Sequence, residues 1–348
     1  MSKWIDFSPD DRITMIQGVA DARRIDEAAA EKDWWVTAVM KAVFQTSVGG
    51  YLLFKGGTSL SKGWNIISRF SEDIDLALSR DFFLNEKGLE CAKCNSKTQI
   101  HNLREKGQDF IYGEFVEELR TQLATMGLEV KVMTEQDERL QKGETRSVPH
   151  DKDPSVIYVQ YPSLYRSQEV YAIPTVKVEV SVLSMSEPWE VRRLSSLVEQ
   201  VYADKDVDSD LVQMVRTVSP TRTFLEKAFL LCEEFQKNKP RTRRMTRHFY
   251  DLEKLMDTQY GRAALADAEL YRSIVEHRRK FYHVGYVDYD KELPGTITIV
   301  PREELLAAYA ADYEAMCGCF IYGDAIPFDR LMERIEELQR RFRNIFHQ

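Results

Sequence analysis

The most constraining feature of the chain is residues 51–78, in which a glycine turn joins two short apolar segments. Residues 51–54 read Tyr-Leu-Leu-Phe and lead to Gly56-Gly57, a pattern that predicts a buried strand followed by a tight turn. Glycine lets the backbone approach a ligand closely. The amides of Gly57, Thr58 and Ser59 can therefore point at phosphate oxygens if the next residues open a helix. Gly-Gly turns also occur in ordinary loops, so the turn alone does not define a site.

A second strand, residues 71–78, carries two spaced aspartates. Its period of two places the three apolar residues on one face and Asp73 and Asp75 on the other. The two carboxylates are then roughly 6 to 7 Å apart along the strand, a span that can bracket ions about 4 Å apart in a two-metal site. Hard oxygen ligands favour Mg²⁺ or Mn²⁺. The alternative is a solvated polar face, but the turn and the acids together predict a metal-dependent nucleotide site.

Residues 175–182 alternate in the same way, with valines on one face and Lys177 and Glu179 on the other. Glu179 is therefore a candidate third carboxylate. The alternative is a plain surface pair between Lys177 and Glu179, and Lys177 could equally orient Glu179. Residues 128–133 and 156–161 predict further strands, whereas the highly charged residues 135–152 predict a loop.

A length of 348 residues predicts about two domains. Ser8-Pro9-Asp10 predicts a helix start, and residues 8–46 continue at helical spacing, which indicates helices bracing the core. We expect a first domain over residues 1–205 and a helical second domain over residues 206–348.

The helical region contains two candidate charged residues. Thr223 and Glu226 have the spacing of a capping box, and Lys227 lies beside the apolar stripe that follows. A lone lysine of this kind is more often solvated. Asp251 lies at the edge of another apolar helical face, where its simplest partner is Arg247, four residues earlier.

The net charge of −8 argues against a surface coated uniformly for nucleic acid. Residues 237–248 nevertheless contain six lysines and arginines and no acid, which indicates a local positive site. A solvated loop is the alternative for the first part of this run, and Arg247 and His248 are the better candidates for ligand contact.

Five cysteines, an odd number, argue against a disulfide framework and for a reducing compartment. The chain has no run of eighteen apolar residues and no apolar signal region, so we expect a cytoplasmic protein without a membrane segment. Cys91 and Cys94 have the spacing of half a zinc site, but nothing brings a second pair to them, and we expect a surface loop without zinc.

These motifs resemble a known family, the AbiEii/AbiGii nucleotidyltransferase toxins, a branch of the DNA polymerase beta-like superfamily. The resemblance rests on Gly56-Gly57-Thr58-Ser59, on residues 69–76 (Arg-Phe-Ser-Glu-Asp-Ile-Asp-Leu), and on downstream runs at residues 225–228, 247–252 and 312–316. It spans roughly residues 35–345. The gap between Gly57 and Asp73 is longer than is general in the superfamily but suits this branch.

The resemblance implies an α+β fold, with a polymerase beta-like core of mixed sheet and flanking helices followed by a C-terminal helical domain. It implies transfer of a nucleoside monophosphate from a nucleoside triphosphate to an acceptor hydroxyl, the 3′ end of tRNA. The enzyme would be the toxin of a type IV toxin–antitoxin pair whose antitoxin is encoded separately. The implied residues are Asp73, Asp75, Lys227 and Asp251 in catalysis, Asp73, Asp75 and Glu179 at the metal, and Gly56, Gly57, Thr58, Ser59, Ser71 and Arg247 at the nucleotide. The alternatives are nucleotidyl or phosphoryl transfer to a protein, and a non-catalytic role as a nucleotide-binding interaction protein.

Overall fold

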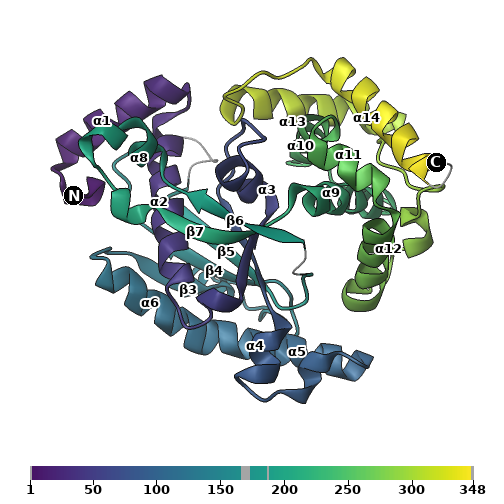
Figure 1. Ribbon diagram of the computed structural model, residues 1–348, viewed down its shortest axis with the longest axis horizontal. Coiled ribbons are helices and arrows are strands. Elements are labelled where there is room, and N and C mark those ends of the chain that lie inside the picture. The colour runs from purple at the N-terminus through teal and green to yellow at the C-terminus, as the bar shows by residue number, and fades with distance from the viewer. Residues whose placement is uncertain (1, 166–172, 186–187, 346–348) are drawn as a thin grey trace. The chain divides into compact units, whose positions relative to one another are not determined.

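The structure is a computed structural model that describes residues 2–165, 173–185 and 188–345 (Figure 1). The chain forms two compact units. The first comprises Met1–Gly63 and Ser71–Thr217, and the second comprises Trp64–Phe70 and Val218–Gln348. Among the described helices, none is both long enough and apolar enough to cross a membrane.

The first unit is built on a seven-stranded mixed sheet. Its strand order is β3-β4-β5-β2-β1-β7-β6. The strands are β1 (Leu52–Lys55), β2 (Asp73–Leu78), β3 (Lys131–Thr134), β4 (Ser155–Gln160), β5 (Thr175–Ser181), β6 (Trp189–Leu194) and β7 (Gln213–Val218).

Strand β1 lies between β2, to which it is antiparallel, and β7, to which it is parallel. Sequence patterns predicted five of the strands but not β6 or β7. They also placed the domain boundary at residue 205, whereas the first unit extends to Thr217. The reason is the pairing of Phe54 with Thr217, a contact between distant residues that no local pattern reveals.

The α-helices among the described residues of the first unit are α1 (Pro9–Arg23), α2 (Glu27–Phe44), α3 (Gly56–Thr58), α4 (Arg80–Asn85), α5 (Lys97–Phe110), α6 (Val116–Thr125), α7 (Glu135–Gln141) and α8 (Leu197–Val201). The predicted start of α1 is confirmed, because Ser8 accepts a hydrogen bond from the Asp11 amide and Pro9 occupies the first helical position. Helix α7 replaces part of the loop predicted for residues 135–152. Thr134 and Asp137 form a capping box that starts this charged helix.

The second unit is helical, as predicted. Its helices are α9 (Pro220–Phe235), α10 (Thr246–Met256), α11 (Gln259–Ala266), α12 (Ala268–His277), α13 (Leu306–Cys319) and α14 (Phe328–Arg343). Helix α9 begins at Pro220 with Ser219 as its cap, so the prediction of a capping box at Thr223 was wrong. The segment Trp64–Phe70 joins this unit through backbone contacts, including a 2.7 Å hydrogen bond from the Phe70 amide to the Phe320 carbonyl.

Four cysteines have described side chains, and all four are free thiols: Cys91, Cys94, Cys232 and Cys317. Cys91 and Cys94 lie in and directly after a short 3₁₀ turn, where the Cys94 thiol contacts the Cys91 carbonyl. Cys232 is buried in α9 among apolar side chains.

Candidate active site

The glycine turn directly follows β1 and opens a helix. Strand β1 ends at Lys55, α3 begins at Gly56, and the π-helical turn η3 (Ser59–Gly63) continues it. Gly56 has a φ of +77°, and a Cβ built on it would lie 1.9 Å from Oδ2 of Asp75. Glycine is required here both for the left-handed backbone and for this close approach. The predicted strand, turn and helix are confirmed, and the turn lies directly against one of the two predicted acids.

The acids lie as the alternation of β2 predicted. Ile74, Leu76 and Leu78 are buried, whereas Asp73 and Asp75 are half-buried on the opposite face. Antiparallel pairing with β1 sets Asp75 opposite Lys55, at the residue where the turn begins. This register explains why Gly56 and the Asp75 carboxylate meet.

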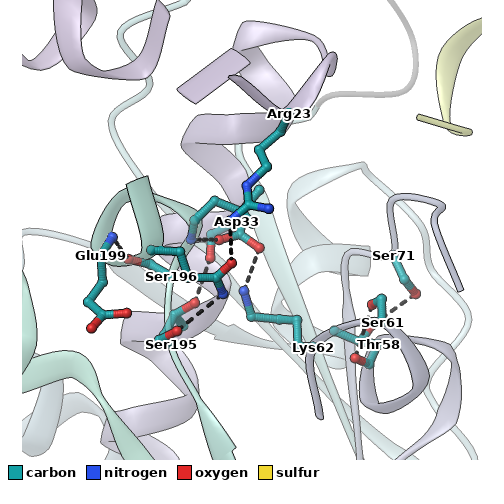
Figure 2. A network of polar contacts seen from close by, with 12 residues as sticks. Arg23, Asp33, Thr58, Ser61, Lys62, Ser71, Ser195, Ser196 and Glu199 are labelled. Carbon is teal, nitrogen blue, oxygen red and sulfur yellow. Dashed lines mark hydrogen bonds and ion pairs between the residues drawn. The ribbon is translucent and has the colours of Figure 1, made fainter. Parts of the chain in front are cut away.

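Hydroxyl groups tie the turn to β2. Thr58 donates its hydroxyl to Ser71 Oγ at 2.9 Å and also contacts the Asp73 carbonyl, as Figure 2 shows for Ser71. Ser59 donates to the Gly56 carbonyl at 2.8 Å. Both Thr58 and Ser59 are fully buried, so these two residues fix the turn, whereas Gly56 and Gly57 are half-buried.

Strand β5 supplies the third predicted carboxylate. It runs parallel to β2, with Lys177 opposite Asp73 and Glu179 opposite Asp75. Lys177 and Glu179 form an ion pair, the alternative that the sequence left open. Burial acts to lower the pKa of Lys177, but the carboxylates of Glu179 and Asp73 raise it on balance.

The carboxylates of Asp73 and Asp75 suit a hard divalent cation, which prefers oxygen ligands. Both lie on one face of β2, and a side chain at Gly56 would occupy the space beside Asp75. In the described part of the chain, no group of three or more His, Cys, Asp and Glu side chains is arranged to hold a metal ion. Glu179 as a metal ligand therefore stays a prediction.

The second unit brings Asp251 and Lys227 together with a residue that sequence reasoning did not select. Asp251, on α10, is fully buried and accepts two hydrogen bonds from Arg69, each 2.7 Å long. The ammonium of Lys227, on α9, lies 2.8 Å from Asp251 Oδ2, the oxygen that also accepts one of the two Arg69 hydrogen bonds. The predicted position of Asp251 at the edge of the buried helical face was wrong, because the residue is fully buried. Arg69 is the first residue of the 69–76 run that carries the resemblance, but only its contact in the fold identifies it as a partner of Asp251.

Burial and charge act against each other in this cluster. Burial raises the pKa of Asp251, but Arg69 and Lys227 outweigh it and hold that pKa well below its usual range. Burial lowers the pKa of Lys227, and the Asp251 charge opposes the change. Asp251 is thus a carboxylate that remains ionised because two cations surround it.

Arg247 and His248 lie on the first turns of α10. Arg247 is half-buried, whereas His248 is buried. Burial, reinforced by the charges of Lys227 and Arg247, lowers the pKa of His248 well below its usual value. His248 is neutral at pH 7, and the cluster of Arg69, Lys227, Arg247 and Asp251 carries a net positive charge that suits phosphate oxygens.

The two units thus divide the predicted residues. The first holds Gly56, Gly57, Thr58, Ser59, Ser71, Asp73, Asp75 and Glu179, and the second holds Lys227, Arg247 and Asp251. A glycine turn against paired strand acids, on a mixed sheet accompanied by a helical unit, is the arrangement of a nucleotidyltransferase.

Comparison with known proteins makes this identification specific. The model of the family described as nucleotidyl transferase AbiEii toxin, type IV TA system, matches residues 39–334. Because that match covers most of the chain, the protein belongs to the AbiEii family of nucleotidyltransferase toxins. The comparison with curated proteins gave no match.

A solved structure has a similar fold. It is the nucleotidyltransferase toxin MenT4 from Mycobacterium tuberculosis H37Rv, which aligns with a TM-score of 0.50 and 18% sequence identity. The alignment covers 95% of this chain and 89% of MenT4. At this identity the likeness supports the α+β fold, and the assignment to a family rests on the family match.

Proposed function

We propose that the protein transfers a nucleoside monophosphate from a nucleoside triphosphate to the 3′ end of tRNA in a Mg²⁺-dependent reaction. The observation that carries the proposal is the contact between the glycine turn and Asp75, since only a residue without a side chain fits between the backbone and that carboxylate. Such a turn leaves backbone amides beside the carboxylates, which suits a metal–triphosphate complex.

In this proposal Asp73 and Asp75 hold the cation, with Glu179 as the candidate third ligand. When bound, Mg²⁺ or Mn²⁺ neutralises charge on the phosphates and on the departing pyrophosphate. The half-buried backbone of Gly56 and Gly57 binds phosphate oxygens, and Thr58 and Ser59 hold the turn in place. Ser71 acts indirectly, because its hydroxyl accepts the hydrogen bond that fixes Thr58.

We assign Lys227 and Arg247 to phosphate binding through their positive charges. Asp251 is poorly suited to act as a general base, because a base works best with a pKa near the operating pH and that of Asp251 is held far lower. We therefore assign Asp251 to holding Arg69 and Lys227 in place, which makes it a positioning residue.

Charge supports RNA as the acceptor. Arg243 and Arg244 are exposed in the basic run before α10, and their positive charges suit a phosphate backbone. Arg241, in the same run, is partly neutralised by Glu234, which its guanidinium contacts at 2.8 Å. We further propose that the protein is the toxin partner of a separately encoded antitoxin, as its family implies.

The test is incubation of the purified protein with total tRNA, Mg²⁺ and each labelled nucleoside triphosphate in turn, beside Asp75→Ala. Label retained in tRNA by the wild type alone is the expected result, and it names the donor. Label on protein instead would show that the acceptor is a protein and not tRNA. Triphosphate binding without any transfer would contradict it.

A further inference from the structure

Three consecutive charged residues are buried in the middle of α2. Glu31, Lys32 and Asp33 are 1%, 3% and 7% exposed, in a helix whose other buried residues are mostly apolar. A buried charge is destabilising unless it is paired and hydrogen-bonded. Successive helical residues point about 100° apart, since a turn holds 3.6 residues. Each of the three can therefore reach a different segment.

Lys32 reaches the strand that carries the acids. Its ammonium pairs with Glu72, which directly precedes Asp73, and donates to the Ile173 carbonyl at 3.1 Å. The Glu72 side chain is itself largely buried. Helix α2 also packs against β2 and β5. Lys32 thus fixes the start of β2 from the helix beneath it.

Asp33 reaches the helix that the glycine turn opens. One carboxylate oxygen pairs with Lys62 in η3, and the other accepts a hydrogen bond from the Leu197 amide at 2.7 Å. Figure 2 shows Lys62 pointing at Asp33 from the helix that carries Thr58. Arg192 holds the end of the same helix through a 3.0 Å hydrogen bond to the Gly63 carbonyl.

Glu31 differs from its two neighbours. It is equally buried, but it accepts hydrogen bonds from Ser163 Oγ and from the Leu164 amide, which lie outside the glycine-turn and aspartate segments. The same helix therefore offers two residues that contact those segments and one that does not. This difference separates positioning of the site from simple stabilisation of α2.

We propose that Lys32 and Asp33 are positioning residues, which act through Glu72 and Lys62 to hold the aspartate strand and the phosphate-binding turn in fixed relation. The inference rests on the proposed function, because it needs the two segments to bind one metal–triphosphate complex. Its physical basis is that a displacement of about 1 Å in such a site can lower the rate about 10²-fold.

The test uses equilibrium binding by the full chain, measured by calorimetry with Mg²⁺ and a non-hydrolysable analogue of each of the four nucleoside triphosphates. The key variant is Asp33→Asn/Lys62→Met, which removes both charges but keeps an oxygen for the Leu197 amide. Single variants leave a buried charge unpaired and are expected to lower Tm by roughly 5 °C or more. The double variant should recover most of that loss and still bind the analogue about tenfold more weakly than the wild type.

The second pair is tested in the same way with Lys32→Met/Glu72→Gln and Mn²⁺ binding measured by electron paramagnetic resonance. A loss of about tenfold in Mn²⁺ affinity is expected, because this pair precedes Asp73. Glu31→Gln is the matched control, and it should keep both affinities within about twofold, whatever its effect on Tm.

Wild-type affinity in both double variants would overturn the inference, as would an equal loss in Glu31→Gln. Failure of the wild type to bind any of the four analogues would instead overturn the proposed function and the inference together. The two failures are therefore distinguishable by the behaviour of the wild type.

Discussion

Aspartates occupy opposite environments in the two units. Asp73 and Asp75 lie half-buried on a strand face beside a glycine turn, whereas Asp251 is fully buried between Arg69 and Lys227. A half-buried carboxylate can accept a cation from solvent at small desolvation penalty. A carboxylate already bound by two buried cations has its charge compensated within the protein. The comparison teaches that environment, rather than residue type, separates a carboxylate that suits a cation site from one whose charge the protein already compensates.

The largest expected effect concerns the strand acids. Asp75→Asn should lower nucleotidyl transfer by roughly 10³-fold or more, because a metal ligand contributes several kcal/mol of charge stabilisation in the transition state. Its stability should change little, since the side chain is half-buried. Steady-state transfer assays and thermal melts on the same preparation check this. Substantial residual transfer would remove Asp75 from the metal site.

Asp251→Asn should lower the free energy of unfolding by about 3–5 kcal/mol, because it leaves two buried cations without their partner. Asp257→Asn is the matched control. Asp257 is also bound by two arginines, Arg334 and Arg341, but its side chain is 54% exposed. The control should lose no more than about 1 kcal/mol. Equal losses in urea unfolding would contradict the difference in burial.

Gly56→Ala should cost about 2–4 kcal/mol and abolish most transfer, because it adds a clash with Asp75 to the strain of a left-handed residue. Gly127→Ala separates the backbone strain from the clash with Asp75. Gly127 has the same φ of +77°, but a Cβ there would meet nothing within 4 Å. This control should lose about 1–2 kcal/mol and keep its activity. Similar activities in the two variants would show that the close approach to Asp75 is not required.

The smallest effect is on pH dependence. The pKa of His248 is lowered by burial, so the unfolded chain binds a proton that the folded chain does not. Stability is therefore present above the ordinary histidine pKa of about 6.5 and falls below it, by up to about 1.4 kcal/mol per pH unit. His248→Gln should remove this part of the slope between pH 7.5 and 5.5 in urea titrations.

His150 provides the opposite sign as a control. Its hydrogen bond to Asp109 raises its pKa, so its contribution grows as pH falls and is lost as pH rises through the folded pKa. His150→Gln should steepen the acid-side loss slightly. If the free energy of unfolding fell less toward acid pH in His150→Gln than in His248→Gln, the directions assigned to both histidine pKa shifts would be contradicted.

Local pattern was sufficient for the first unit's motif but not for the second unit's cluster. The alternation of β2 and the glycine turn each lie within a few residues, so periodicity alone predicted the faces of Asp73 and Asp75. The Arg69 contact to Asp251 joins residues 182 positions apart, and the pairing of β7 with β1 is similarly distant. Helix α7 was not predicted for another reason. Its highly charged sequence is typical of a loop, and only the cap at Thr134 indicates that a helix begins there.

The most direct test of this comparison is Mn²⁺ binding, measured by electron paramagnetic resonance with a non-hydrolysable triphosphate analogue present. The wild type should bind Mn²⁺, and Asp75→Asn should bind it at least about tenfold more weakly while its Tm stays at the wild-type value. Equal Mn²⁺ affinity in the two proteins would contradict the central claim that the half-buried acids of β2 form the metal site.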